Sequence, residues 1–298
     1  MLAVDRVRRS FGSVPAVSDV SFRVEPGTVF GLLGPNGAGK TTTMRMILGI
    51  YVPDAGSILW RGRPVDLRVR RTFGYLPEER GLYGKMTVLD QIVYFGKLHG
   101  VPRAVATERA RHWMEMLGVS QYAERACNEL SRGNQQKVQM ASAVIHAPEL
   151  LVLDEPFSGL DPMNAQTMLD CIKVLAAEGT SIILSSHQMF QIEDACRSFC
   201  IVGAGRVRAA GTLAELRSVF PTRVVCVSPD LPSIRAAFAA NGASEPAVSP
   251  GGLEYEFPAE TDFSALLRDV VAAGPVESFE RREPSLGQIY ARALEERA

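Results

Sequence analysis

The segment that most constrains the fold of this chain is GLLGPNGAGKTTTMRMIL, at residues 31–48. Four residues within it follow the spacing G-x-x-x-x-G-K-[ST] of a phosphate-binding loop: Gly34, Gly39, Lys40 and Thr41. The apolar run before the loop predicts a buried strand, and apolar residues at helical spacing after it predict a helix. A glycine-rich turn between a strand and a helix leaves backbone N–H groups free at the positive end of the helix, where a polyphosphate would sit.

Two side chains of this segment add to the predicted anion site. The Lys40 ammonium can neutralise β- and γ-phosphate oxygens, and the Thr41 hydroxyl can ligate Mg²⁺. The alternative interpretation is a glycine-rich turn with a structural role alone. Because a strand and a helix flank the motif, we favour a nucleotide-binding loop.

Length and composition limit the remaining possibilities. At 298 residues the chain is too long for one typical core, so we expect one large domain and a smaller one. Its 46% of hydrophobic and 22% of charged residues are ordinary for a soluble globular protein. The formal net charge of −1 argues against a dedicated nucleic-acid binder.

Cysteine usage and the N-terminus bear on the compartment. Five scattered cysteines without C-x-x-C spacing indicate reduced, mostly buried thiols of a cytosolic protein. Cys196 and Cys200 lie one helical turn apart, but no second ligand pair accompanies them, so we favour packing over metal binding. The N-terminal MLAVDRVRRS lacks the apolar stretch of a signal peptide, and no apolar run approaches the ~20 residues that span a bilayer. We therefore expect any action at a membrane to depend on a partner.

The pattern of apolar segments predicts two domains. Residues 1–30 indicate short antiparallel strands, and alternating strands and helices up to about residue 209 indicate a parallel sheet with helices on both faces. Composition shifts near residue 220, beyond which the order βαββαβ plus a final helix predicts a small α+β ferredoxin-like domain. We expect domains at residues 1–219 and 220–298, and interpret the second as a regulatory or interaction module.

Reactive side chains follow two strands of the predicted parallel sheet. One all-apolar run ends in Asp154 and Glu155, where Asp154 can hold Mg²⁺ beside the phosphate loop and Glu155 can orient and polarise an attacking water. His187 follows a strand predicted at 181–186, at the end where βα domains place their ligands. We expect His187 to contact the γ-phosphate.

A second helix start carries another candidate anion site. The sequence LSRGNQQK, at residues 130–137, offers free N–H groups together with the Ser131 hydroxyl and Gly133. One ATP contacted by both anion sites, within one molecule or across two, would explain why the chain has both.

These motifs together carry a family resemblance. The order of the phosphate loop, LSRGNQQ, LLVLDEP, SGLD and SSH resembles that of the ATP-binding subunits of ABC transporters, over about residues 2–219. The resemblance implies a P-loop NTPase fold of the ABC type, with an antiparallel β subdomain and a helical subdomain at about 85–146. It also implies an ATPase whose cofactors are ATP and Mg²⁺.

The resemblance further implies that two such domains pack head to tail. Ser131, Gly133 and Gln135 of one domain would then contact the ATP held by the other. The residues that would hold that ATP are Phe11, which takes the place of the adenine-stacking aromatic, and Gly34, Pro35, Asn36, Gly37, Ala38, Gly39, Lys40, Thr41 and Thr42. Asp161 ends the SGLD segment, which matches the D-loop between the two sites.

Two departures from the family pattern stand out. Arg132 and Asn134 replace a Gly and a Gln of the signature. Glu78 stands where the family usually has a Gln that acts as a Mg²⁺ or water ligand and as a coupling hinge. A carboxylate can still ligate Mg²⁺, so we include Glu78 with Thr41 and Asp154 among the expected metal ligands.

The function expected from this resemblance is transport. PEERGLYGKMTVLDQIVYFGKLHG and the C-terminal EPSLGQIYARAL look like a subgroup with a C-terminal extension that is associated with efflux of sodium ions or small toxic compounds. We expect a cytoplasmic subunit, peripheral to the inner face of the cell membrane, that dimerises on ATP and powers export through a separate membrane permease. Its expected partners are that permease and a second copy or a homologous ATPase subunit, and no nucleic acid.

The alternative is a soluble ABC-type ATPase that acts on ribosomes or DNA. Such proteins usually fuse two ATPase domains or carry coiled coils, zinc motifs or basic arms. This chain has a single phosphate loop, none of those insertions and a balanced charge. The sequence therefore favours transport.

Overall fold

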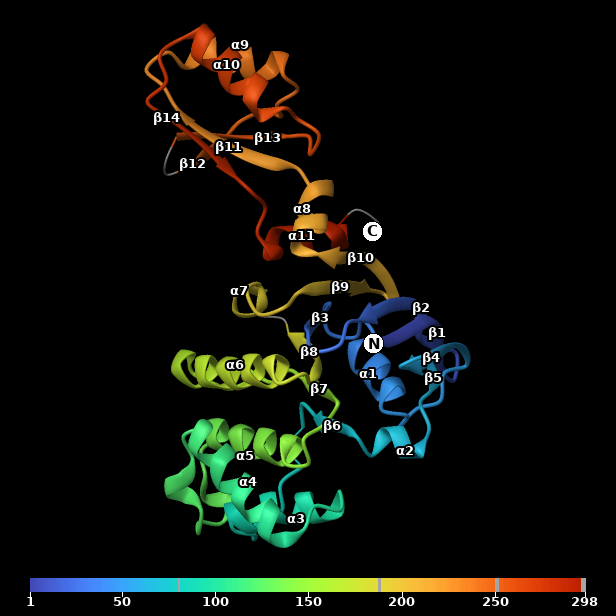
Figure 1. Cartoon of the computed structure of the whole chain (residues 1–298). Coiled ribbons are helices and arrows are strands. Elements are labelled where there is room, and N and C mark those ends of the chain that lie inside the picture. The colour runs from blue at the N-terminus through green and yellow to red at the C-terminus, as the bar shows by residue number, and fades with distance from the viewer. Residues whose placement is uncertain (80, 187–188, 250–251, 296–298) are drawn as a thin grey trace. The chain divides into compact units, whose positions relative to one another are not determined.

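The computed structural model describes residues 1–79, 81–186, 189–249 and 252–295, and the chain divides into two compact units, Met1–Ala210 and Gly211–Ala298 (Figure 1). The division falls before the boundary at 219/220 that the sequence suggests. The reason is helix α8 (Leu213–Val219), which contacts the C-terminal helix α11 (Leu286–Glu295). Nε of Arg217 on α8 donates to the carbonyl of Pro284 at 3.1 Å, so α8 belongs with the second unit.

The first unit is built on a mixed sheet of ten strands, in the order β5-β4-β1-β2-β10-β9-β3-β8-β7-β6. The strands are β1 (Leu2–Phe11), β2 (Val14–Val24), β3 (Val29–Leu33), β4 (Ala55–Trp60), β5 (Arg63–Pro64), β6 (Phe73–Leu76), β7 (Leu150–Asp154), β8 (Ser181–Ser186), β9 (Ser198–Gly203) and β10 (Arg206–Thr212). Strands β9, β3, β8, β7 and β6 run parallel, whereas β1, β2, β4 and β5 pair antiparallel. The predicted α/β fold with an antiparallel part is confirmed.

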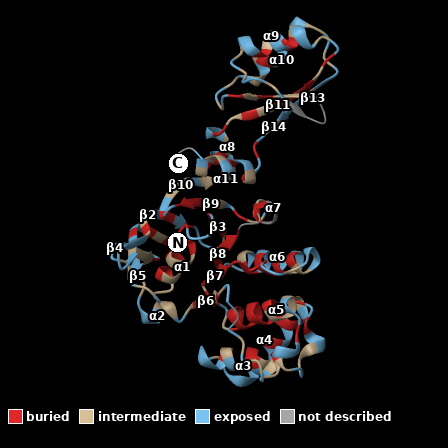
Figure 2. Ribbon diagram, turned by 180° about the vertical axis from the view of Figure 1, so that it is seen from behind, coloured by how far each residue is buried: buried red, intermediate tan, exposed pale blue. Residues whose placement is uncertain are grey.

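The central strands are buried along their whole length because their side chains are apolar on both faces. Every residue of β3 and β7 is buried, as a strand covered by helices on both sides requires. Helix α6 (Pro162–Ala177) presents one buried and one exposed face (Figure 2).

The other helices of the first unit include a compact group of three. Helices α3 (Val88–Leu98), α4 (Arg103–Met116) and α5 (Arg132–Val144) pack on one another, drawn in green in Figure 1. They lie within the range 85–146 for which the resemblance implies helices. The remaining helical elements are α1 (Lys40–Ile47), α2 (Leu67–Arg70), α7 (Met189–Ile192) and the 3₁₀ turns Ser120–Tyr122 and Cys127–Glu129.

The second unit has its own sheet and core. Its strands β11 (Thr222–Val227), β12 (Ala247–Ser249), β13 (Gly252–Phe257) and β14 (Ser278–Arg282) form an antiparallel sheet in the order β12-β13-β11-β14. Helices α9 (Leu231–Ala240) and α10 (Phe263–Ala273) follow the first and third strands. Phe238 of α9 is fully buried against the rings of Tyr255 and Phe257. This strand order is that of the predicted ferredoxin-like domain.

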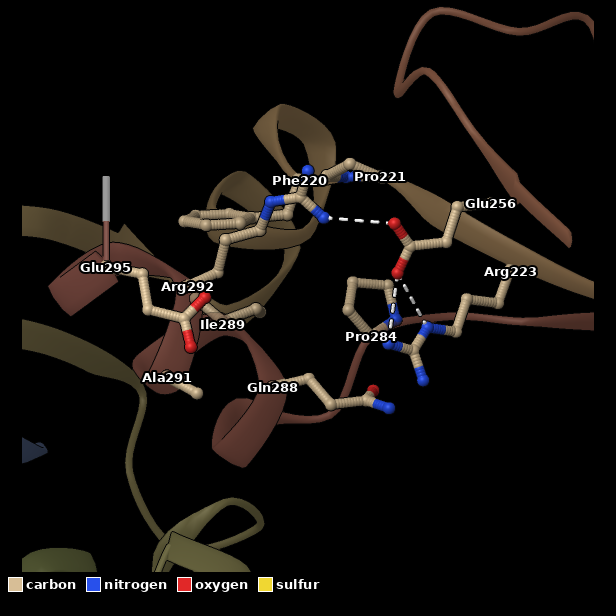
Figure 3. A pocket seen from close by; sticks show the side chains of 10 residues that line it. All are labelled: Phe220, Pro221, Arg223, Glu256, Pro284, Gln288, Ile289, Ala291, Arg292 and Glu295. Carbon is tan, nitrogen blue, oxygen red and sulfur yellow. Dashed lines mark hydrogen bonds and ion pairs between the residues drawn. The ribbon is translucent and has the colours of Figure 1, made fainter. Parts of the chain in front are cut away.

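Ion pairs attach α11 to the sheet of the second unit. Glu256 on β13 accepts from Arg223 on β11 at 3.0 Å and from Arg292 on α11 at 3.2 Å (Figure 3). These side chains line a cavity of about 280 Å³ together with Phe220, Pro221, Pro284, Gln288, Ile289, Ala291 and Glu295.

The cysteines behave as small buried apolar residues. All five are buried and unpaired, and burial raises the pKa of Cys171 to about 11 and that of Cys200 to about 12. Among the side chains that the structure describes, no group of three or more His, Cys, Asp or Glu residues could hold a metal ion. None of the helices in the described ranges is long and apolar enough to cross a membrane.

Candidate functional site

The glycine-rich loop connects the end of β3 to the start of α1, as its motif predicts. Two of its glycines have no room for a side chain. A Cβ on Gly39 would lie 2.6 Å from the carbonyl oxygen of Ala16, and Gly39 has a left-handed φ of +102°. A Cβ on Gly34 would lie 2.4 Å from the carbonyl oxygen of Val202. The spacing of glycines in the motif therefore follows from backbone packing against neighbouring strands.

Lys40 lies across this loop. Its side chain is only 7% exposed, and Nζ donates to the carbonyl oxygens of Gly34 at 2.7 Å and Pro35 at 3.2 Å. A buried ammonium held by two carbonyls is a positive charge fixed at the centre of the loop. The loop thus combines free N–H groups, a helix N-terminus and a cation.

The loop opens into a cavity of about 470 Å³ that unites segments far apart in the sequence. Its lining consists of Phe11, Ala16, Pro35, Asn36, Gly37, Ala38, Gly39, Lys40, Thr41, Thr42, Glu78, Asp154 and Glu155. Most of the site residues suggested by the sequence thus surround one space. The cavity of the second unit, beside Glu256 and Arg292, contains none of these site residues.

Asp154 has a buried carboxylate oxygen that is suited to bind a cation in this cavity. It ends β7 and is 1% exposed, and its Oδ1 accepts from Oγ of Ser185 at 2.8 Å. Its Oδ2 is also buried but has no hydrogen-bond partner within the described residues. A buried carboxylate oxygen without a donor fits a bound cation. A magnesium ion keeps several waters and phosphate ligands, so a cluster of three protein acids is not required.

Glu155 occupies a constrained position next to Asp154. It is 8% exposed and has a left-handed φ of +51°, uncommon for a residue other than glycine. Its backbone N–H donates to Oγ of Ser185 at 2.9 Å. This sharp turn directly after β7 gives the two neighbouring carboxylates different orientations.

Ser185 is a site residue that the sequence reasoning missed. Its hydroxyl joins the Asp154 carboxylate to the Glu155 backbone, and it is fully buried in β8. The available signal was the pair of serines that ends a predicted strand, SIILSS at residues 181–186.

Phe11 and Glu78 are exposed residues that line the same cavity. Phe11 is 43% exposed and packs its ring edge-on against Tyr51, with the centroids 5.2 Å apart. Viewed alone, Phe11 resembles a core residue, but its exposure agrees with the role that the resemblance implies. Glu78 is exposed in the segment after β6.

The signature residues stand apart from the phosphate loop of their own chain. Ser131 caps α5 by accepting from the Asn134 N–H at 3.4 Å and is exposed, and Gln135 Nε2 donates to the Cys127 carbonyl at 3.0 Å. Gly133 lies beside Leu160 of the SGLD segment, to which its added Cβ would approach within 3.3 Å. None of these residues is part of the cavity lining given above.

Of the two remaining predicted site residues, the structure describes Asp161 but not His187. Asp161 caps α6 by accepting from the Asn164 N–H at 2.9 Å, and this hydrogen bond lowers the pKa of its carboxyl. His187 lies outside the described residues, directly after β8 ends at Ser186.

Removing the Ser185 hydroxyl should destabilise the first unit. In Ser185→Ala, Asp154 Oδ1 and the Glu155 N–H both lose a buried partner, so we expect the free energy of unfolding to fall by about 1–3 kcal/mol in urea titrations. Ser142→Ala is the matched control, because that hydroxyl only bonds back to the Val138 carbonyl of its own helix at 2.9 Å. Equal losses in both variants would contradict the bridging role.

Comparison with known proteins agrees with this site. A family model described as ABC transporter matches residues 17–158. The uncharacterized ABC transporter ATP-binding protein YhaQ of Bacillus subtilis is 40% identical over 97% of this chain and 97% of its own length. The Nod factor export ATP-binding protein I of Paraburkholderia xenovorans is 37% identical over 71% of each chain. A solved ATP-binding subunit of an ABC transporter is 32% identical, with a TM-score of 0.68 over 73% of this chain and 92% of its own.

The similarity to YhaQ extends over nearly the whole chain and suffices to assign the family. ABC ATP-binding domains bind ATP, in general with Mg²⁺, and ATP-binding subunits generally dimerise and pair with membrane permease subunits. The chain therefore belongs to the ABC transporter family, as an ATP-binding subunit that hydrolyses ATP.

Proposed function

We propose that this subunit dimerises on ATP and powers export through a separate membrane permease at the inner face of the cell membrane. The observation that carries the proposal is the cavity in which the phosphate loop meets Asp154, Glu155 and Glu78. ATP hydrolysis needs a phosphate cradle, a metal ligand and a group that activates water, and this cavity offers all three.

The binding half of the mechanism rests on the loop and Phe11. Free N–H groups of the loop and of the first turn of α1 hold the phosphates together with the Lys40 ammonium, and the exposed ring of Phe11 stacks on adenine. Thr41, Asp154 and Glu78 are the proposed Mg²⁺ ligands. The ion, when bound, neutralises the developing charge on the phosphate oxygens.

The catalytic half rests on Glu155. Its backbone is fixed by Ser185, so its carboxylate can orient a water for in-line attack and accept that water's proton. His187, in its proposed role, donates a hydrogen bond to the γ-phosphate from the end of β8. The roles of both residues depend on a nucleotide in the loop.

The second half of the site comes from a second copy or a homologous subunit. The N-terminus of α5 is an anion site with an exposed Ser131, and this segment does not line the cavity of its own chain. We propose that Ser131, Gly133 and Gln135 complete the ATP site of the partner, with Asp161 of the D-loop between the two sites. Dimerisation on ATP follows, because the nucleotide supplies the contact between the halves.

A second hollow in the first unit suits a segment of the permease. It has a volume of about 350 Å³ and is lined by Phe73, Tyr75, Pro77, Gly81, Leu82, Phe95, His99, Gln139, Ser142, Ala143 and His146. Burial lowers the pKa of His146 to about 4, so its ring is neutral at pH 7 and the hollow is largely apolar. Pro77 lines this hollow while Glu78 lines the ATP cavity, so a permease segment bound here would contact the same stretch of backbone that carries a metal ligand.

Export is the direction that the relatives favour. The relative from Paraburkholderia is named for Nod factor export, and we extend export, without the cargo, to this chain. The alternative of a soluble ATPase acting on ribosomes or DNA is not favoured, because the relatives are named as transporter subunits.

The assignment of Glu155 predicts a trapped dimer. In Glu155→Gln the water loses its proton acceptor while the nucleotide contacts remain, so we expect ATP turnover to fall at least about 100-fold and a stable dimer to form with Mg²⁺ and ATP. Size-exclusion chromatography with light scattering measures the dimer. The same variant carrying Lys40→Ala should stay monomeric, and hydrolysis at the wild-type rate by Glu155→Gln would refute the role of Glu155.

If Glu78 is a metal ligand, as proposed, ATPase activity should survive its replacement by glutamine. Glu78→Gln keeps an oxygen ligand at the same distance from the backbone, so we expect ATPase activity to persist with a shifted dependence on metal concentration or pH. Initial rates over a range of Mg²⁺ and pH test this. Complete loss of turnover would contradict it.

Transport itself is tested with the permease. We expect the subunit to co-purify with a membrane protein that has several ~20-residue apolar spans. Inverted vesicles containing both should accumulate cargo only with ATP, and Glu155→Gln should abolish uptake. Co-purification with ribosomes or DNA instead would favour the alternative function.

A further inference from the structure

Gln139 makes a two-point contact with the segment that carries Glu78. Its side chain lies on α5 and is only 6% exposed. The amide Nε2 donates to the carbonyl oxygens of Pro77 at 3.1 Å and Glu79 at 3.2 Å. An amide nitrogen has two hydrogens, so both are used, and the two acceptors are the residues on either side of Glu78.

This contact restrains the backbone that carries the Glu78 side chain. Glu78 lies beyond the end of β6 in backbone without regular structure. Because the carbonyls before and after it are tied to one amide, its backbone dihedrals are restrained, and so is the direction in which its carboxylate leaves the chain. The carboxylate itself lines the ATP cavity.

A packing role explains Gln139 poorly. Its Oε1 is buried and has no hydrogen-bond partner among the residues that the structure describes. An orphaned buried acceptor costs free energy, and a leucine or methionine would fill the same apolar surroundings without that cost. What distinguishes the amide from an apolar side chain here is the pair of hydrogen bonds that its nitrogen donates.

The same helix also holds the segment that follows Glu155. Gln136, three residues before Gln139 and on the same face of α5, is 2% exposed and donates to the Pro156 carbonyl at 3.3 Å. Helix α5 therefore contacts the backbone beside Glu78 and beside Glu155, two of the three cavity carboxylates, and its N-cap is Ser131, the proposed contact with the partner's nucleotide.

We propose that Gln139 is a positioning residue for Glu78, through which the signature helix sets the geometry of the metal site. The inference rests on the proposed function in one respect, that Glu78 is a Mg²⁺ ligand. Gln139 itself touches neither nucleotide nor metal.

The test is a double-mutant cycle of Gln139→Leu and Glu78→Ala. Gln139→Leu should lower kcat about tenfold, the loss expected when hydrogen bonds to the Glu78 segment are removed, and should raise the Mg²⁺ concentration for half-maximal activity. ATP affinity without Mg²⁺ should be unchanged, because the phosphate loop is untouched. In the Glu78→Ala background, Gln139→Leu should have little further effect, since the ligand it positions is gone.

A readout without metal or turnover separates positioning from activity. Amide hydrogen exchange at Glu78 and Glu79 should be faster in metal-free Gln139→Leu than in the wild type. Gln91→Met is the control for loss of a buried amide, because Gln91 contacts Tyr83 and Cys127 and neither cavity. It should leave the Mg²⁺ dependence and the exchange at Glu78 and Glu79 unchanged.

Three outcomes bear against the inference. Losses that multiply in the double variant, or wild-type Mg²⁺ dependence in Gln139→Leu, would overturn it. Unchanged exchange at Glu78 and Glu79 would do the same. Gln139→Met, which keeps the length and flexibility of the side chain, replaces the leucine variant if that fails to fold. A wild-type protein without Mg²⁺-dependent ATPase activity would instead refute the proposed function and is recognised before any variant is made.

Discussion

The parallel register of β6, β7, β8 and β3 is the constraint on which the candidate site depends. Leu33, the last residue before the phosphate loop, pairs with Ser186, while Ser185 pairs with Asp154 and Leu153 with Leu76. Since parallel strands end at the same edge, this register brings the phosphate loop and the acidic residues to one place. The hydrophobic burial of these strands therefore determines the geometry of polar chemistry at their ends.

The charged side chains that line the cavity favour a bound cation. Glu78, Asp154 and Glu155 line it together, and Lys40 supplies the one ammonium among the lining residues that the structure describes. Carboxylates that share a cavity favour a cation between them, and the Asp154 Oδ2, which has no hydrogen-bond partner within the described residues, marks where one fits. In the proposed role of Glu78 as a metal ligand, its charge would strengthen this preference for a divalent cation relative to a neutral glutamine.

The sequence predicted those parts of the molecule that depend on local or periodic signals. The glycine-rich loop, the all-apolar run before Asp154 and the βαββαβ order of the second unit each carry such a signal, and the fold agrees with each. The sequence suggests a boundary at 219/220 and the contacts divide the chain at 210/211, because nothing in the sequence of α8 reveals that it packs against α11, some seventy residues further on. Ser185 and Gln139 escape prediction for the same reason. Each acts through a neighbour on another element, and a single polar residue in a strand or helix leaves no periodic pattern in the sequence.

The position of α5 gives the proposed half-sites a physical connection. The helix begins directly after its exposed N-cap, Ser131. Further along it, Gln136 and Gln139 donate hydrogen bonds to the backbone beside Glu155 and Glu78. A rigid helix transmits displacement along its axis, because its backbone hydrogen bonds resist bending. In the proposed dimer, a nucleotide bound by the partner at Ser131 therefore fixes the helix that orients the carboxylates of this chain's own cavity. The two proposed ATP sites would then be coupled through the fold itself, and a permease segment in the hollow beside Gln139, as proposed, would contact the same helix.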